Sequence, residues 1–219
     1  MMDEVARFYL LETPEALMDI MKNAIVQTWG LKTKTYRQAQ ALKFEEVKGV
    51  HKGYKDNDEI PILRLKDADN DDMSFASYIC DYKDGQINYQ VLDKGANFCF
   101  TWTMNGCTFG IGSRTSDGAV MVSHGNAKGQ IPKGGSQQET LSAQHAKQKG
   151  WAEALHGDSV TMLQPATYRP VGSKQVATTF GLKTADGWKF YYQSYDIPGG
   201  GRMDLKGVHP IVGKNSHTY

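Results

Sequence analysis

Two residues near the middle of the chain, Cys107 and His124, could act together as a nucleophile and a base. They flank a polar loop, Arg114–Asp117, that separates two β-rich runs. If Ser113 and Gly118 close this loop as a hairpin, Cys107 lies directly opposite His124. Opposed side chains on one face have Cβ atoms about 4.5–5.5 Å apart, so a thiol and an imidazole could share a proton. The thiolate is the nucleophilic form of cysteine, and the spacing therefore predicts nucleophilic catalysis.

The same two residues also have a structural interpretation. Cysteine is often a small buried hydrophobe, and a single histidine in a strand is often structural. A register shift of one residue would place the two side chains on opposite faces of the sheet. Alkylation separates the two interpretations. A catalytic Cys107 should react with iodoacetamide faster than Cys80 or Cys99, and His124→Ala should slow that reaction.

Attack on a carbonyl also requires an oxyanion hole and access for the substrate. We expect the donors to be backbone N–H groups at Cys107 and in the adjoining turn, Asn105-Gly106, because glycine has no side chain to block approach. Two glycine-rich segments could lie against an incoming chain, namely Gly125–Gly135 and Gly199–Gly201.

A further group must orient the imidazole of His124. If Asn105-Gly106 forms a two-residue hairpin turn, Thr103 lies opposite Thr108 and shares a face of the preceding strand with Thr101. Either threonine could then hold His124 through its hydroxyl or its backbone carbonyl. Asn126, which follows His124 closely, is an alternative. Threonines are also common in strands for packing reasons alone.

Bulk composition limits the classes of function. The chain has 219 residues, of which 40% are hydrophobic and 22% charged, which is enough to bury the core of one domain. The formal net charge of +1 gives no electrostatic reason to expect nucleic acid or a membrane as a partner. No apolar run approaches the roughly 20 residues that span a bilayer, and the N-terminus lacks the basic-then-apolar order of a secretory signal.

The cysteines and acidic residues do not form a metal site. Cys80, Cys99 and Cys107 are odd in number and include no CxxC pair, which favours reduced thiols in a cytosolic setting. The acidic run Asp67–Asp72 resembles a calcium loop but lacks its central glycine, and Tyr78 stands where the terminal glutamate belongs. We therefore expect neither a metal nor another cofactor.

Residues 1–50 are expected to be helical. Thr13-Pro14-Glu15 is a helix start, with a capping residue, a proline in the first turn and an early acidic residue. The apolar spacing that follows continues to Gly30. A second helix is expected over Lys34–Val47.

The chain beyond residue 58 is rich in β-strand patterns. The capping box Ser136–Glu139 predicts one helix there, over Gln137–Leu155. Strands are expected over Ile60–Leu65, Phe75–Tyr82, Gln86–Leu92, Gln175–Lys183 and Trp188–Asp196. These elements predict an α+β fold, a β-sandwich of mixed and antiparallel sheets flanked by helices. We expect one domain over 1–219, with a helical N-terminal part and a β-rich catalytic core at 58–219.

The stretch Thr101-Trp-Thr-Met-Asn-Gly-Cys107, followed by His124, resembles the cytotoxic necrotizing factor-type deamidases, including Burkholderia lethal factor. Chemoreceptor glutamine deamidases have a related site. In these families a Gly-Cys pair ends a short turn before a strand, and a histidine lies on the adjacent strand. The lethal-factor type also has a threonine six residues before the cysteine, which corresponds to Thr101. The toxin pattern is Leu-Ser-Gly-Cys, where this chain has Met104-Asn-Gly-Cys107.

The resemblance implies a β-sandwich with surrounding helices and a hydrolase that deamidates a glutamine, less often an asparagine, in a target protein. It also implies that a threonine or a main-chain carbonyl is the third element of the site, after Cys107 and His124. A bacterial toxin or effector would follow, present in the producing cytoplasm as a monomer and exported into a target-cell cytosol without a cleaved signal peptide. The alternatives are a non-catalytic β-sandwich module that binds proteins, and a Cys/His peptidase.

Overall fold

The computed structural model describes residues 13–29, 31, 38–47, 60–68, 74–131, 134, 136–197 and 202–213. The Gly199–Gly201 segment, most of the acidic Asp67–Asp72 run and part of the Gly125–Gly135 loop lie outside these residues, so the expectations for them are not addressed. Within the described part of the chain, no helix is long and apolar enough to cross a membrane.

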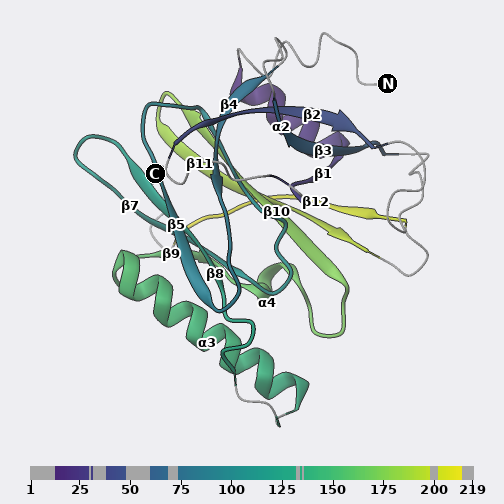
Figure 1. Ribbon diagram of the computed structural model, residues 1–219, viewed down its shortest axis with the longest axis vertical. Coiled ribbons are helices and arrows are strands. Elements are labelled where there is room, and N and C mark those ends of the chain that lie inside the picture. Colours follow the sequence, from purple (N-terminus) through teal and green to yellow (C-terminus); the bar gives the residue numbers. More distant parts are fainter. Residues whose placement is uncertain are drawn as a thin grey trace.

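Two β-sheets stack face to face, and helices cover their outer faces (Figure 1). The larger sheet has eight strands in the order β1 (Ile25–Gln27), β3 (Ile62–Asp67), β2 (Gln40–Glu46), β4 (Phe75–Cys80), β6 (Phe98–Thr101), β10 (Gln175–Thr184), β11 (Gly187–Asp196) and β12 (Asp204–Pro210). The smaller has four, in the order β5 (Gln86–Leu92), β8 (Val120–Asn126), β7 (Thr108–Arg114) and β9 (Thr161–Leu163). The helices are α2 (Pro14–Asn23), α3 (Gln137–His156) and α4 (Pro165–Tyr168). The expected α+β sandwich is confirmed.

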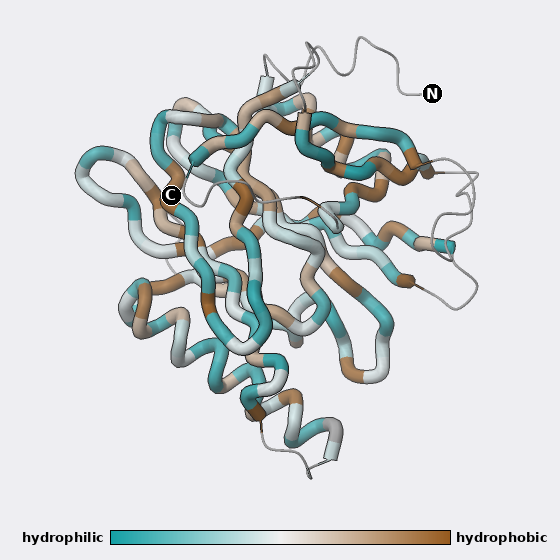
Figure 2. Tube along the Cα trace, in the orientation of Figure 1, coloured by the Kyte–Doolittle hydropathy of each residue, from teal (hydrophilic) through white to brown (hydrophobic). Residues whose placement is uncertain are grey.

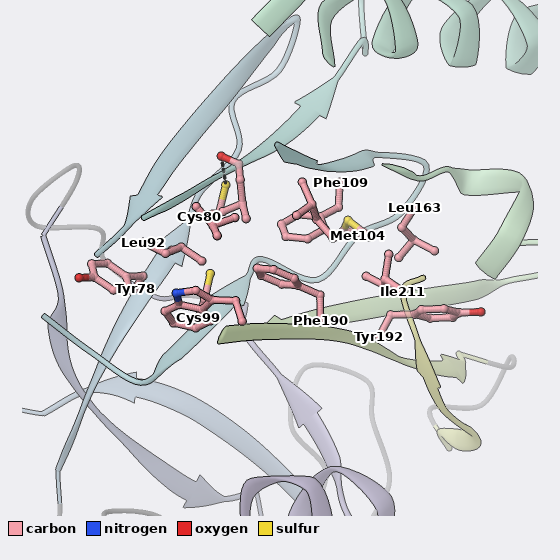
Figure 3. Close-up of a cluster of buried hydrophobic side chains, with 14 of the residues drawn as sticks. Tyr78, Cys80, Leu92, Cys99, Met104, Phe109, Leu163, Phe190, Tyr192 and Ile211 are labelled. Carbon is pink, nitrogen blue, oxygen red and sulfur yellow. Dashed lines mark hydrogen bonds between the residues drawn. The ribbon is translucent and has the colours of Figure 1, made fainter. Parts of the chain in front are cut away.

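The apolar core occupies the two sides of the larger sheet. Between the sheets, side chains of β4, β6 and β11 meet side chains of β7 and β8, and these include Cys80, Phe109 and Phe190 (Figure 3). On the opposite face of the larger sheet, α2 packs Leu17 and Met21 against other strand residues. Burial of apolar area on both sides fixes this sheet between two layers.

The N-terminal segment is less helical than expected. Helix α2 begins at Pro14, as the start signal predicts, but it ends at Asn23 and the chain enters β1. The second helix expected over Lys34–Val47 is wrong, because strand β2 occupies Gln40–Glu46. Leu42 and Phe44 are buried in alternation, which is the period of a strand, and β2 pairs with both β3 and β4.

Helix α3 begins where the capping box predicts. The Ser136 hydroxyl accepts a hydrogen bond from the Glu139 backbone N–H, and the Glu139 side chain accepts one from the Ser136 backbone N–H. The helix packs against β7, β8 and β5 on the outer face of the smaller sheet. Its tube in Figure 2 is mostly teal and white, so α3 is rich in polar residues, and Gln144, Gln148 and His156 hydrogen-bond to β7, β8 or the segment before β7.

The β7–β8 hairpin forms, but its register differs from the expected one. Phe109 lies opposite His124 and Thr108 lies opposite Gly125, whereas the sequence predicts Cys107 opposite His124. The shift begins at the loop, where Arg114 pairs with Val120 in place of the expected Ser113 with Gly118, and an irregularity between Ile111 and Arg114 then moves the pairing back by one residue. Because the pairing moves by two residues, each side chain keeps its face of the sheet.

The Asn105-Gly106 segment is not the expected hairpin turn. Strand β6 pairs with β4 and β10 in the larger sheet, whereas β7 belongs to the smaller one. Thr103 therefore does not pair with Thr108. The chain instead crosses from one sheet to the other here, and Gly106 has a φ of 91°, in the left-handed region that favours glycine.

The register makes Gly110 sensitive to any side chain. It lies opposite Ser123, and a Cβ at position 110 would lie 2.6 Å from the Ser123 hydroxyl oxygen. Gly110→Ala should lower the free energy of unfolding by about 1–3 kcal/mol. The loss should be smaller in a protein that also carries Ser123→Ala, because the clashing hydroxyl is then absent. Urea unfolding of the unsubstituted protein, the two single variants and the double variant measures both effects. The expected register would instead place Gly110 opposite Met121, and an equal cost in both backgrounds would contradict the observed pairing. Gly150→Ala, with nothing within 4 Å, is the control.

Candidate active site

Cys107 and His124 both belong to the face of the smaller sheet that looks toward the larger one. Cys107 directly precedes β7 and packs in the same buried cluster as Phe109, the residue opposite His124. The Cys107 side chain is 5% exposed and His124 is fully buried. The expected direct opposition is replaced by a diagonal relation, which long or aromatic side chains can still span.

The imidazole of His124 is fixed by a backbone carbonyl of the larger sheet. Nδ1 lies 3.3 Å from the carbonyl oxygen of Cys80, at the end of β4. A carbonyl can only accept, so Nδ1 carries the proton and Nε2 is left as the basic nitrogen. Nε2 is buried and has no hydrogen-bond partner within the described residues. It therefore makes no hydrogen bond to Cys107 either.

Tyr82 contacts the histidine through its ring. Its ring centroid is 5.4 Å from that of His124 and 5.8 Å from that of Trp102. Burial raises the pKa of Tyr82, and the nearby carboxylate of Asp84 raises it further. The Tyr82 ring lies between those of His124 and Trp102 in a chain of aromatic contacts. Nothing in the local sequence around Tyr82 distinguishes it from an ordinary strand-end aromatic.

Burial keeps both candidate catalytic groups neutral. It raises the pKa of Cys107 to about 12, which a hydrogen bond from the Asn105 backbone N–H partly opposes. It lowers the pKa of His124 to about 4, against a smaller opposite effect of the Cys80 carbonyl. The resting pair at neutral pH is therefore a thiol and a neutral imidazole, not an ion pair. In this neutral state, His124 could act as a general base that takes the thiol proton of Cys107 while the sulfur attacks.

The expected oxyanion donors are only partly available. The backbone N–H of Gly106 donates to the Tyr168 hydroxyl at 2.9 Å, so it does not point at a substrate. The remaining donor among those expected is the N–H of Cys107. The side chain of Asn105 is exposed and hydrogen-bonds to the Arg169 guanidinium.

The threonines and Asn126 do not orient His124. The Thr101 hydroxyl accepts a hydrogen bond from the Thr179 backbone N–H at 3.3 Å. The Thr103 hydroxyl contacts other hydroxyls within the larger sheet, including those of Thr28, Thr178 and Tyr195. Both threonines lie on β6 or directly after it, and the failure of the expected turn removes them from the histidine.

Asn126 instead belongs to a polar group at the end of the β8 strand. Its side-chain amide donates to the Asp84 carboxylate at 3.0 Å, and its carbonyl accepts from the Lys128 backbone N–H at 3.0 Å. Lys128 also pairs with Asp84, with 3.0 Å between Nζ and Oδ2. In the described part of the chain, no group of three or more His, Cys, Asp or Glu residues could hold a metal ion.

Comparison with known proteins finds likeness at the level of structure and none at the level of sequence. No protein-family model matches this chain, and no curated protein does. A similar solved structure is the crystal structure of the C-terminal domain of CNFy from Yersinia pseudotuberculosis. Its sequence is 10% identical, the TM-score is 0.41, and the alignment covers 94% of this chain and 96% of that chain. At these values the likeness carries no residue role and no activity to this chain.

The buried imidazole predicts a loss of stability in acid. The unfolded chain binds a proton at His124 below about pH 6.5, whereas the folded protein binds it only near pH 4. The free energy of unfolding should therefore fall as the pH is lowered between these values, by up to about 1.4 kcal/mol per pH unit. Urea unfolding from pH 7 to pH 4.5 should show a shallower decline for His124→Gln. Equal slopes for the two proteins would contradict a buried neutral His124.

The neutral pair also predicts how Cys107 alkylation depends on pH. With His124→Ala, the rate of reaction with iodoacetamide should rise about tenfold per pH unit from 7 to 9, because the thiolate fraction does so below a pKa of about 12. The unsubstituted protein should show an additional rate at pH 6–7 that His124 provides as a base. Peptide mapping by mass spectrometry separates Cys107 from Cys80 and Cys99. Identical pH profiles for the two proteins would remove His124 from any role at the sulfur.

Proposed function

We propose that this chain is a cysteine-dependent protein deamidase that hydrolyses a glutamine or asparagine side-chain amide. The observation that carries the proposal is the state of His124. Its Nδ1 is anchored by the Cys80 carbonyl, and its Nε2 is an unpartnered base on the same face as Cys107. The resemblance in sequence implies a threonine or a main-chain carbonyl as the third element, and the Cys80 carbonyl takes that role here.

The proposed reaction has two stages. Cys107 gives its proton to Nε2 of His124 as Sγ attacks the amide carbon, and the carbonyl oxygen becomes an oxyanion beside the N–H of Cys107. The C–N bond then breaks, and His124 returns the proton to the nitrogen, which leaves as ammonia. Water attacks the thioester with His124 as base, releasing the carboxylic acid product and the free thiol.

The surroundings of Tyr82 fit an amide substrate. The half-buried rings of Tyr82 and Trp102 lie in contact beside His124. Trp102 Nε1 is a buried donor without a partner within the described residues. His124 Nε2 is a buried acceptor that likewise lacks a partner there. An amide group carries both a carbonyl acceptor and N–H donors, so it could pair with each.

The proposed setting is that of a bacterial effector acting on a protein inside another cell. This part rests on the sequence resemblance alone. A non-catalytic binding module is the second candidate, favoured by the low exposure of the Cys107 side chain, 5%. In that case Cys107 and His124 are core residues.

Conversion of glutamine to glutamate in cell extracts tests the proposal. Lysates of bacterial and of cultured animal cells are incubated with the protein, digested, and searched by mass spectrometry for peptides in which an amide NH2 has become OH. We expect conversion at specific sites, and its loss with Cys107→Ser or His124→Gln. Cys99→Ser is a matched control, because Cys99 is a buried thiol of the same core cluster.

Three results would contradict the proposal. Conversion that persists with Cys107→Ser would assign the activity elsewhere. New peptide termini without amide conversion would favour the Cys/His peptidase, and neither change in any lysate would favour the binding module.

A further inference from the structure

The backbone of Gly106 and Cys107 is held by side chains of two helices. Tyr168, from α4, accepts a hydrogen bond from the Gly106 N–H and donates one to the Cys107 carbonyl, each at 2.9 Å. Gln144 and Gln148, from α3, both donate from Nε2 to the Gly106 carbonyl, each at 3.0 Å. Three of the four polar backbone groups of this dipeptide are thus occupied. No described residue accepts a hydrogen bond from the fourth, the N–H of Cys107.

Gln148 is itself held in one orientation. Its side chain is fully buried, and its Oε1 accepts a hydrogen bond from the Thr108 hydroxyl at 2.8 Å. The Gly106 carbonyl can only accept, so the NH2 group of the amide faces it and the amide oxygen faces the Thr108 hydroxyl, which donates. A buried glutamine with both ends paired is a fixed donor, whereas Gln144 is half-buried and has one bond to the loop.

The hydrogen bonds from Gln144 and Gln148 to the Gly106 carbonyl determine where the Cys107 N–H points. The peptide between Gly106 and Cys107 is trans, so its C=O and N–H point in opposite directions. Helix α3 lies on the outer face of the smaller sheet and draws the carbonyl toward itself. The N–H therefore points away from α3. The Cys107 side chain is also directed away from α3, into the layer between the sheets.

We infer that Gln148, assisted by Gln144 and Tyr168, is a positioning residue that holds the N–H of Cys107 toward the oxyanion. This inference rests on the proposed function. The glutamines touch neither the substrate nor the reacting sulfur. They act through the Gly106 carbonyl, and the preformed donor needs no rearrangement when charge develops on the substrate oxygen.

Two reactions of Cys107 separate this role from general support of the loop. Iodoacetamide is attacked at its CH2 carbon, a thioether forms and iodide leaves, so no oxyanion develops. With p-nitrophenyl acetate the sulfur adds to the carbonyl carbon, an oxyanion forms, and p-nitrophenolate leaves as the thioester is made. Only the second reaction should depend on the direction of the Cys107 N–H.

The variants are Gln148→Met, which removes the donor but keeps the volume, and the double variant with Gln144→Met. Gln138→Met, on the exposed surface of the same helix, is the matched control. We expect the acylation rate to fall about tenfold in Gln148→Met and about a hundredfold in the double variant, the second value being at the lower end of the range found when an oxyanion donor is lost. Alkylation should change less than twofold, and Gln138→Met should alter neither rate.

Each other outcome has a defined meaning. An equal fall of both rates would show that the glutamines only maintain the loop, and unchanged acylation would show that they are dispensable; both results overturn the inference. An unsubstituted protein that is alkylated but not acylated at Cys107 would overturn the proposed function, and with it this inference. That failure is visible before any variant is made.

Discussion

One buried hydrogen bond, from Nδ1 of His124 to the carbonyl of Cys80, determines what the space between the sheets can do. It joins β8 of the smaller sheet to the end of β4 in the larger one. Burial disfavours a charged imidazole, and the carbonyl fixes which nitrogen holds the proton. The pair of sheets therefore presents a single neutral base, Nε2, in a layer that otherwise consists mainly of apolar and aromatic side chains.

The crossing of the chain between the two sheets leaves the cysteine at the start of β7, on the same face of the smaller sheet as that base. Strand β6 ends in the larger sheet and β7 begins in the smaller one, so the intervening segment cannot satisfy its backbone groups by strand pairing alone. Side chains of α3 and α4 supply the missing partners at Gly106 and Cys107. The polar face of α3, unusual for a helix that covers a sheet, has its physical explanation in this role.

Local signals in the sequence were reliable where the structure depends on nearby residues. The helix start at Pro14, the capping box at Ser136 and the strand Gln86–Leu92 are all confirmed, because capping and turn chemistry act over a few residues. The helix expected over Lys34–Val47 failed since its apolar residues serve a strand that pairs with β3 and β4. Such pairing is a tertiary effect that outweighs local preference.

By itself the sequence determined that Cys107 and His124 belong to neighbouring strands of one hairpin, and alternation puts them on the same face for any register that differs from the expected one by an even number of residues. Their register, the sheet crossing before Cys107 and the partners of His124 were decided only by the tertiary structure. The carbonyl of Cys80 and the ring of Tyr82 come from strands or loops distant in sequence, and a backbone carbonyl has no residue-type signature. Alternation is a property of a single strand, whereas the arrangement of these groups depends on how two sheets and α3 pack together.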